Sequence, residues 1–277
     1  MSFSPDWLAL REGADHRSRD ALLAMKVADR LQGADPVRVT DLGCGTGSNI
    51  RASYALLGPR QHWTLVDYDP KLLAVARTRL AAWADKAETH ADHLALEKSG
   101  KSLIVRFREA DLTRDLDFAI GDAPHLVTAQ ALFDLCSKSF IETFAAAVAA
   151  RKAVFYTVLT YNGVQSWKPE HAKDTAMAEA FHAHQVRDKG FGASAGPLAP
   201  AVLGGAFRAA GYHVAEGDSP WLLGRLDQAL VDALAQGFAD AVAETGAIDA
   251  ASIAEWRTIA RTFAEVGHTD TFAWPAD

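Results

Sequence analysis

The sequence has few cysteines and no long hydrophobic run. Cys44 and Cys136 are the only cysteines among its 277 residues, which excludes a disulfide-rich scaffold and a cysteine-rich zinc module and is typical of a reducing compartment. No apolar run approaches the roughly 18 residues that a membrane-spanning helix needs. The first residues show neither the hydrophobic segment of a signal peptide nor an acylation motif. These absences predict a cytoplasmic protein that does not enter a membrane.

The chain also has fewer basic residues than acidic residues. The chain has 28 Lys and Arg residues against 35 Asp and Glu residues, which gives a formal net charge of -7. Proteins that bind nucleic acid usually carry a basic face, so nucleic acid is not an expected partner. The apolar fraction of 49% is that of an ordinary globular protein. Because the chain shows no repeat and no linker, we predict a single domain over residues 1–277.

Short β-rich runs alternate with helical patterns along most of the chain. The runs cover residues 37–42, 62–67, 103–108, 124–128, 153–159, 212–214 and 271–274. Alternation of this kind predicts βαβ units, right-handed crossovers and a parallel sheet. We therefore predict an α/β fold with a mostly parallel seven-stranded sheet and helices on both faces.

Additional helices are expected around this core. A helix over 18–31 belongs to an N-terminal helical lid of about residues 1–33, and a helical cap is inserted at about 161–200. Two amphipathic helices come later, and the second starts near Ser252, where Glu255 completes a capping box. The stripe of the first consists of Leu226, Leu230, Leu234 and Phe238. Such stripes fit equally a cover for the sheet edge and a homodimer interface.

A glycine-rich turn follows the first predicted strand. It reads Asp41-Leu42-Gly43-Cys44-Gly45-Thr46-Gly47. Glycines at alternate positions let the backbone turn tightly and let a ligand approach without interference from a Cβ atom. The second predicted strand ends in Asp67, where an acid can accept hydrogen bonds from ribose hydroxyls. Since ligands of open α/β sheets bind beyond the C-terminal ends of the strands, this edge is the predicted site for a nucleoside-containing cofactor.

The spacing of the glycines separates two cofactor classes. A dinucleotide site needs G-x-G-x-x-G, whereas this turn has G-x-G-x-G with Asn49 two residues beyond it. Asp41, directly before the glycines, would repel a pyrophosphate and attract a cationic ligand. S-adenosyl-L-methionine carries a sulfonium and an ammonium group and no phosphate. It therefore fits this turn better than a nicotinamide dinucleotide does.

Three stretches of the chain together resemble the class I S-adenosyl-L-methionine-dependent methyltransferases. They are VTDLGCGTGSN at 39–49, LVDYDP at 65–70 and EADL at 109–112, and the resemblance extends over about residues 37–159. It implies a Rossmann-like fold and S-adenosyl-L-methionine as the cofactor, with S-adenosyl-L-homocysteine as the product. Three acids receive roles from it: Asp41, with Gly43 and Gly45, would hold the methionyl part, Asp67 the ribose and Asp111 the adenine amino group.

The resemblance also gives expectations for the neighbours of these acids. Tyr68 and Leu112 would flank the adenine ring. Thr128, Ala129 and Gln130, after the fourth predicted strand, would line the sulfonium side of the cofactor.

Other members of the predicted cofactor site have plainer alternatives. Cys44 and Asn49 complete the set, although Cys44 is also expected to pack as a small apolar residue. Arg11 could form a bidentate pair with the carboxylate of the cofactor, or it could belong to a solvated helix start. Asp67 and Asp111, taken singly, could be solvated loop acids or helix caps.

The acceptor class is narrowed by motifs that the chain lacks. After the fourth predicted strand there is no Asn/Asp-Pro-Pro-aromatic motif, the mark of amide or adenine nitrogen methylation within the resembling family. The Pro-Cys nucleophile of cytosine C5 enzymes is missing too, because Pro124 is followed by His125. A small-molecule acceptor is therefore expected.

The predicted cap supplies the candidate catalytic residues. Its helix, at about 172–187, would place His184 and Asp188 one turn apart, where the carboxylate could orient the imidazole as a general base. Tyr161 could shape the same pocket. The alternative for His184 is a structural or surface residue. The His-x-His at 182–184 does not suffice for a metal site, and we predict none.

The function predicted from these observations is methyl transfer from S-adenosyl-L-methionine to an O- or N-nucleophile of a small molecule, by in-line displacement. Such a reaction requires mainly that the acceptor be held in line at near-attack distance. One alternative is a non-catalytic cofactor-binding or scaffold subunit with the same fold. A nicotinamide-dependent oxidoreductase is the other, and the glycine spacing and Asp41 disfavour it.

Overall fold

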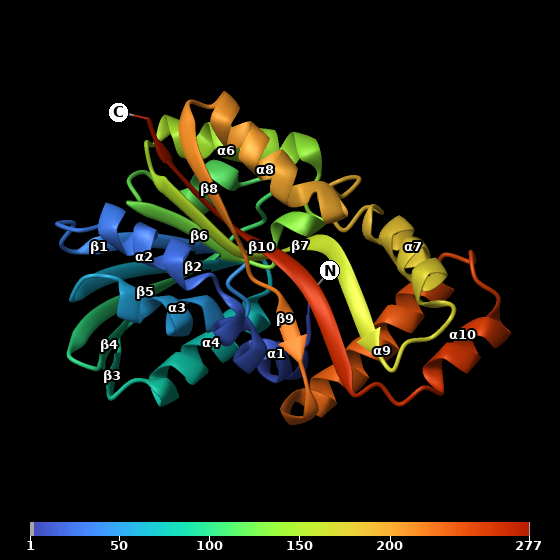
Figure 1. Cartoon of the computed structure of the whole chain (residues 1–277). Coiled ribbons are helices and arrows are strands. Elements are labelled where there is room, and N and C mark those ends of the chain that lie inside the picture. Colours follow the sequence, from blue (N-terminus) through green and yellow to red (C-terminus); the bar gives the residue numbers. More distant parts are fainter. Residues whose placement is uncertain (1–2, 277) are drawn as a thin grey trace.

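The centre of the molecule is one sheet of ten strands (Figure 1). The structure is a computed structural model that describes residues 3–276; the outermost residues of the predicted lid and domain, 1–2 and 277, lie outside the described residues. In chain order the strands are β1 (Val37–Leu42), β2 (Arg60–Asp67), β3 (Lys86–Thr89), β4 (Leu94–Lys98), β5 (Lys101–Glu109), β6 (Leu126–Gln130), β7 (Val154–Lys168), β8 (Tyr212–Asp218), β9 (Trp221–Leu223) and β10 (Phe263–Pro275).

The predicted seven-stranded unit lies within this sheet in the order β5-β2-β1-β6-β7-β10-β8. The strands from β5 to β7 pair in parallel, and β10 runs antiparallel to both β7 and β8. The predicted Rossmann-like α/β fold with a mostly parallel core is thus confirmed. The predicted number of strands is wrong, because the sheet has ten strands rather than seven.

The additional strands are β3, β4 and β9. The antiparallel pair β3–β4 extends the sheet beyond β5, and β9 pairs with β10. All four residues of β3 are exposed. The sequence therefore has no alternation of apolar and polar residues there from which the strand could be predicted. One of its few lateral contacts is the ion pair between Lys86 Nζ and Glu97 Oε2, at 2.7 Å.

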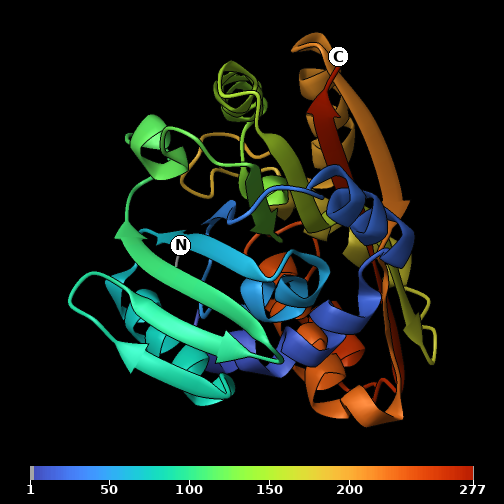
Figure 2. The same cartoon turned by 90° about the vertical axis from the view of Figure 1, so that its left-hand side faces the viewer.

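Helices cover both faces of the sheet (Figure 2). Leu23, Ile50 and Leu80 pack one face together with Trp63, while Phe144 and Phe207 pack the other against Phe155. The helices, in chain order, are α1 (Pro5–Ser18), α2 (Ala21–Arg30), α3 (Ser48–Ser53), α4 (Pro70–Trp83), α5 (Leu116–Ile120), α6 (Lys138–Ala150), α7 (Asp174–Gln185), α8 (Ala199–Ala209), α9 (Gln228–Ala243) and α10 (Ala250–Arg257).

The N-terminal lid contains two helices instead of the single predicted helix at 18–31. α1 begins after Ser4, whose Oγ accepts a hydrogen bond from Trp7 N. α2 begins after Asp20, whose carboxylate accepts one from Leu23 N. α1 escaped prediction because its buried side includes the charged Arg11 and Asp15, so it lacks the apolar stripe that marks a helix in a sequence.

The cap is built from two segments that are far apart in the chain. α7 packs on α9, and α10 packs on α9 as well; Figure 1 shows these three helices gathered at one end of the molecule. Trp167, Phe181, Phe238 and Trp256 form its aromatic core. The predicted insertion at 161–200 supplies α7, whereas its first residues, up to Lys168, continue strand β7.

The C-terminal helices turn their apolar faces inward. Leu230, Phe238 and Val242 of α9 are buried inside the chain, so this part of the stripe packs within the cap, although Leu226 at its start is fully exposed. The homodimer stays a prediction. The predicted capping box at Ser252 is wrong. The helix starts earlier, and Asp249 is its N-cap, accepting a hydrogen bond from Ser252 N.

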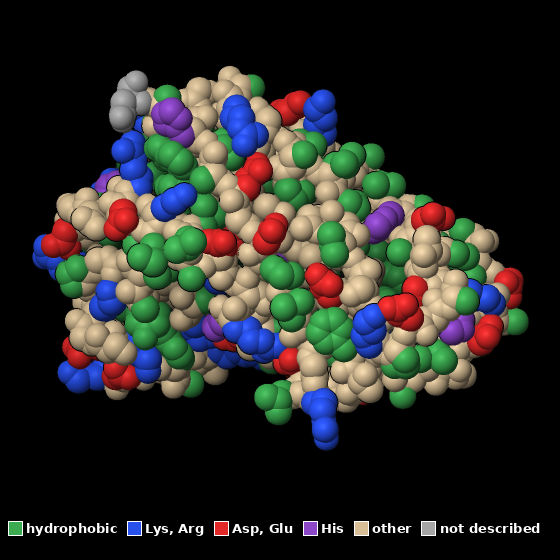
Figure 3. All heavy atoms as spheres, in the orientation of Figure 1, with side chains coloured by type: hydrophobic (Ala, Val, Ile, Leu, Met, Phe, Trp, Pro, Cys, Tyr) green, Lys and Arg blue, Asp and Glu red, His purple; other side chains and the backbone are tan. Residues whose placement is uncertain are grey.

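The described surface shows no membrane-spanning element. None of the helices within residues 3–276 is long and apolar enough to cross a membrane. On the face drawn in Figure 3, acidic and basic side chains are interspersed, and no basic patch dominates it.

Candidate functional site

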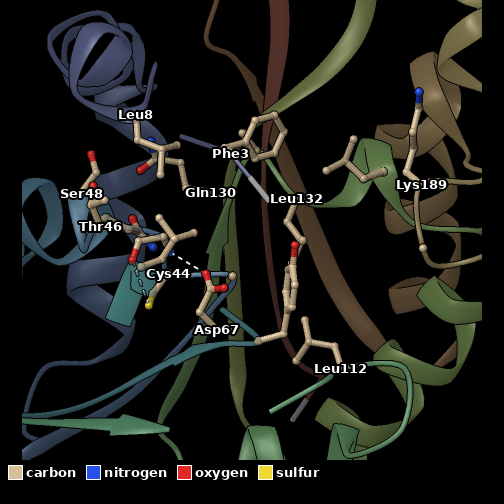
Figure 4. Close-up of a pocket in the computed structure, with 18 of the residues that line it drawn as sticks. Phe3, Leu8, Cys44, Thr46, Ser48, Asp67, Leu112, Gln130, Leu132 and Lys189 are labelled. Atoms are coloured by element: carbon tan, nitrogen blue, oxygen red, sulfur yellow. Dashed lines mark hydrogen bonds between the residues drawn. The ribbon is translucent and has the colours of Figure 1, made fainter. Parts of the chain in front are cut away.

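One pocket lies at the C-terminal edge of the parallel strands, beneath α1 and the loop that follows α7 (Figure 4). Residues from the loops after β1, β2 and β5 form one half of its wall, which we call the strand-edge half. The predicted cofactor residues that line the pocket are Arg11, Gly43, Cys44, Gly45, Asn49, Asp67, Tyr68, Asp111 and Leu112. The structure thus brings together most of the residues that the sequence motifs singled out.

The glycine turn needs its glycines. Gly43, Gly45 and Gly47 have φ values of 61°, 53° and 76°, a left-handed region that costs residues with a Cβ atom about 1 kcal/mol or more. A Cβ atom on Gly45 would also lie 3.1 Å from Cδ1 of Leu8. The turn can therefore present bare backbone to a ligand while α1 closes over it.

Asp67 stands at the end of β2 with its carboxylate fixed by backbone amides. Gly45 N donates to Oδ2 at 2.9 Å, and Asp69 N donates to Oδ1 at 3.0 Å. The residue is only 6% exposed, and this burial raises the pKa of the carboxyl group against the opposing effect of those hydrogen bonds. Each oxygen keeps further acceptor capacity toward the pocket.

Asp111 and its neighbours provide the far wall of the strand-edge half. Thr113 donates to Asp111 Oδ1 through its Oγ1 at 2.7 Å and its N at 2.9 Å, and these hydrogen bonds lower the pKa of the Asp111 carboxyl group. Leu112 is buried, whereas Tyr68 is 48% exposed. The two side chains offer an apolar and an aromatic surface beside Asp67.

Asp41, Thr128 and Ala129 lie behind the pocket wall and do not line it. Asp41 is fully buried, and Asn49 Nδ2 donates both to its Oδ1 at 2.7 Å and to Thr128 Oγ1 at 3.1 Å. Burial raises the pKa of Asp41 to about 7. The expected direct contacts of these three residues with a cofactor do not fit this arrangement. Asn49, which does line the pocket, is the residue that contacts Asp41 and Thr128.

A chain of polar contacts ties α1 to the end of β6. Arg11 Nε donates to Asp15 at 2.9 Å, and Gln130 Nε2 donates to the same carboxylate at 2.6 Å. Gln130 Oε1 in turn accepts from Arg19 Nη2 at 2.7 Å. Arg11 is therefore already paired with a carboxylate of this chain. The sequence pointed to Arg11 and Gln130, but Asp15 and Arg19 carried no signal besides their charge.

The same chain of contacts reaches the glycine turn. Arg19 Nη1 donates to Ser53 Oγ at 2.9 Å. Ser53 Oγ donates to Asn49 Oδ1 at 3.3 Å, and Asn49 holds Asp41. Helix α1, Arg19 between α1 and α2, and helix α3 thus share one hydrogen-bond network.

The other half of the pocket wall, which we call the outer half, is mostly apolar. Its residues come from the N-terminal segment, from the loop after β6 and from the loop after α7, and they are Phe3, Leu8, Leu132, Leu135, Lys189, Gly190 and Phe191. Figure 4 shows Lys189 on the opposite side of the pocket from Thr46 and Ser48. None of these residues was predicted, because no local motif links them.

The predicted His184–Asp188 pair does not form. α7 ends at Gln185, so Asp188 lies beyond the helix and its carboxylate accepts from Gly190 N and Gly192 N instead. His184 Nε2 lies 2.9 Å from Glu244 Oε2. Tyr161 is buried, and its hydroxyl lies 3.0 Å from His182 Nε2. None of the three predicted catalytic residues is among those that line the pocket.

Metal chemistry has no candidate centre in residues 3–276, where no group of three or more His, Cys, Asp or Glu side chains could hold an ion.

Comparisons with known proteins agree with this geometry. A family model described as a methyltransferase domain matches residues 39–105, the segment that contains the glycine turn and Asp67. No curated protein matches the chain.

Two solved structures share the fold. The first, a cyclopropane-fatty-acyl-phospholipid synthase-like protein from Lactobacillus casei, has 13% identity and a TM-score of 0.50 over 95% of this chain and 99% of that one. YcgJ from Bacillus subtilis has 12% identity and a TM-score of 0.51 over 93% and 100% of the two chains.

A third structure extends over the whole of both chains. It is an S-adenosyl-L-methionine-dependent methyltransferase from Thiobacillus denitrificans in complex with S-adenosyl-L-homocysteine, with 16% identity, 100% of each chain covered and a TM-score of 0.46. The resemblance seen in the sequence is confirmed by the family match and by the order of the strands. The chain has the class I methyltransferase fold, with a methyltransferase domain match at residues 39–105.

Proposed function

We propose that this protein binds S-adenosyl-L-methionine in the pocket and transfers its methyl group to a small molecule. The observation that carries the proposal is the position of Asp67. Its carboxylate is held by Gly45 N of the glycine turn and faces the pocket at the end of β2. A carboxylate at that place, joined to such a turn, suits the two hydroxyl donors of a ribose.

The remaining residues of the strand-edge half fit the other parts of the cofactor. Tyr68 and Leu112 provide surfaces for the adenine ring, and Asp111 provides an acceptor for its amino group. The bare backbone of Gly43 and Gly45 suits the methionyl part. When bound, the cofactor supplies an electrophilic methyl group on a sulfonium, and the acids of this half match its positive charge.

The outer half suits a small-molecule acceptor. Its wall is formed by the apolar side chains of Phe3, Leu132, Leu135 and Phe191. A site with an apolar wall and few polar groups is typical of small-molecule recognition. These side chains would exclude water and hold an oxygen or nitrogen nucleophile near the methyl group. Placement in line at near-attack distance is the main demand of such a displacement.

Calorimetric titration with S-adenosyl-L-homocysteine tests the cofactor assignment. We expect micromolar binding to the unmodified protein and at least about tenfold weaker binding to Asp67→Ala, since the variant loses hydrogen bonds to a charged group. Asp92→Ala is the matched control, because Asp92 is an exposed acid between β3 and β4 that is paired with His93 at 2.8 Å. Lack of binding to the unmodified protein would contradict the proposal, and nicotinamide cofactors would then be titrated.

Transfer itself is tested separately. The protein is incubated with S-adenosyl-L-methionine labelled in the methyl group and with a fractionated small-molecule extract. Label in a product fraction, lost with Asp67→Ala, is the expected result. Tight cofactor binding with no transfer to any fraction would favour a non-catalytic cofactor-binding subunit.

A further inference from the structure

The two halves of the pocket differ in charge. The strand-edge half carries the acids Asp67 and Asp111. The outer half, as defined above, carries no acid and one cation, Lys189, while the ion-paired residues Arg11 and Asp15 of α1 also line the pocket. Whether each of these cations is already neutralised by the protein decides what else the outer half can bind.

Arg11 is neutralised. Its Nε lies 2.9 and 3.2 Å from the two carboxylate oxygens of Asp15, and its guanidinium lies 5.0 Å from the ring centroid of Trp221. Asp15 is almost completely buried, so the pair is screened little by solvent. Arg11 has a charge partner of its own and is not available as the main anchor for a second anion.

Lys189 forms no direct ion pair of this kind. Its Nζ lies 3.3 Å from Nδ1 of His184, and within the described part of the chain it forms no ion pair with a carboxylate. Nζ also lies 3.5 Å from Nε2 of the same ring, and Oε2 of the nearby acid Glu244 lies 2.9 Å from that Nε2. Against the larger effect of burial, the charge of Glu244 raises the pKa of Lys189. Arg187 also contacts Glu244, through the backbone oxygen. The ammonium group thus contacts the imidazole ring that Glu244 also contacts, and Lys189 itself lines the pocket.

Apolar side chains line the same part of the pocket as Lys189. Phe191 and Leu135 line the pocket with it, and partial burial lowers the pKa of Lys189. An ammonium group at an apolar wall is stabilised by an anion that occupies the pocket beside it, because the attraction is stronger where water is scarce.

We propose that Lys189 anchors an anionic group of the methyl acceptor, so that the acceptor is an apolar molecule carrying a carboxylate. This inference rests on the proposed function, since it assigns the acceptor to the half of the pocket that the cofactor leaves open. Lys189 acts as the specificity-determining residue, and His184 is a positioning residue that acts through it.

The test uses three probes with the same eight-carbon chain: octanoate, octan-1-ol and octylamine. Each is titrated calorimetrically into the protein saturated with S-adenosyl-L-homocysteine. We expect octanoate to bind about tenfold more tightly than octan-1-ol and octylamine to bind most weakly, in keeping with one charge-assisted hydrogen bond. Lys189→Met should abolish the preference for octanoate, and Lys189→Arg should restore it.

Two further variants test whether the preference for octanoate depends on Lys189 itself or on the stability of the cap. Lys173→Met removes a lysine of the same cap that is paired with Glu255 and Ser252 and lies outside the pocket lining, so the preference for octanoate should survive. His184→Phe should reduce the preference while leaving the affinity for octan-1-ol unchanged; a merely structural role would lower both affinities together.

The outcomes are distinguishable. Equal affinities for octanoate and octan-1-ol, no measurable octanoate binding, or a preference that survives Lys189→Met would each overturn the inference while S-adenosyl-L-homocysteine still binds. Failure of the unmodified protein to bind S-adenosyl-L-homocysteine would instead overturn the proposed function, and the inference with it.

Discussion

At the scale of one residue, the buried carboxyl group of Asp41 destabilises the folded state when it is charged. Its side chain is fully buried, Asn49 satisfies Oδ1, and Oδ2 has no hydrogen-bond partner among the described residues. Burial raises the pKa of the carboxyl group from 3.8 to about 7. The folded state therefore favours the neutral form of Asp41. The contribution of this protonated carboxyl group to the free energy of unfolding is complete below about pH 4 and is lost as the pH rises toward 7.

Asp41→Asn should remove this pH dependence. At pH 8 the variant should have a free energy of unfolding about 2 kcal/mol higher than that of the unmodified protein, because no charge is buried. At pH 4 the two should differ little. Urea unfolding at both pH values measures the difference, and an equal effect at pH 4 and pH 8 would contradict the interpretation.

The residues of the strand-edge half were predictable because their signals are local. Gly43 and Gly45 sit in a turn that requires positive φ, and Asp67 ends a strand that its own neighbours define. Lys189 and Leu135 had no such signal. They reach the pocket through loops whose positions depend on α7 and β6, and no spacing within the sequence connects them.

At the scale of elements, a hydrogen-bond network joins α1 of the lid to the end of β6. Arg19 is half-buried, and desolvation lowers the pKa of its guanidinium. Gln130 contributes both contacts that join Arg19 to Asp15. Loss of this amide would leave the half-buried Arg19 short of an acceptor and the buried Asp15 of α1 short of a donor.

Gln130→Leu should therefore lower the free energy of unfolding by about 2 kcal/mol, the cost of buried polar groups that lose their partners. It should also speed hydrogen exchange of the α1 amides. Gln236→Leu is the control, because Gln236 is bound to Asp240 on the exposed side of α9. Unchanged exchange in α1 would show that the lid does not depend on this network.

Element boundaries were harder to predict wherever the partner is distant in the chain. β7 was expected to end near Leu159, yet it continues to Lys168 because β10 pairs along its whole second half. Asn162, Gly163 and Gln165 read as a loop in isolation. The antiparallel ladder with β10, about a hundred residues later, supplies the hydrogen bonds that make them a strand.

The whole molecule consists of a sheet that carries the cofactor residues and a cap that closes the outer half. One polar centre holds the cap together: Asp174 accepts from Arg261 Nη2 at 3.0 Å and from Trp256 Nε1 at 2.7 Å. Arg261 is 2% exposed and lies 4.5 Å from the Trp256 ring centroid. Its charge has no comparable partner elsewhere in the described residues.

Asp174→Ala should cost about 3 kcal/mol of stability, since it leaves a buried guanidinium uncompensated. Binding of S-adenosyl-L-homocysteine should persist, because its proposed contacts lie at the strand edge and not in the cap. Chemical unfolding and calorimetry measure the two effects. Asp232→Ala, on the outer side of α9 where Gln228 binds it, is the control. Equal loss of stability and of binding would show that the halves are not separable.

The antiparallel pair β3–β4 also affects how the protein behaves at high concentration. Strand β3 ends the sheet on one side, is only four residues long, and has every side chain exposed, among them Lys86 and Glu88. A short charged strand is a poor template for another chain, because pairing would bury those charges. The long parallel sheet is thereby protected from growing into aggregates through this edge.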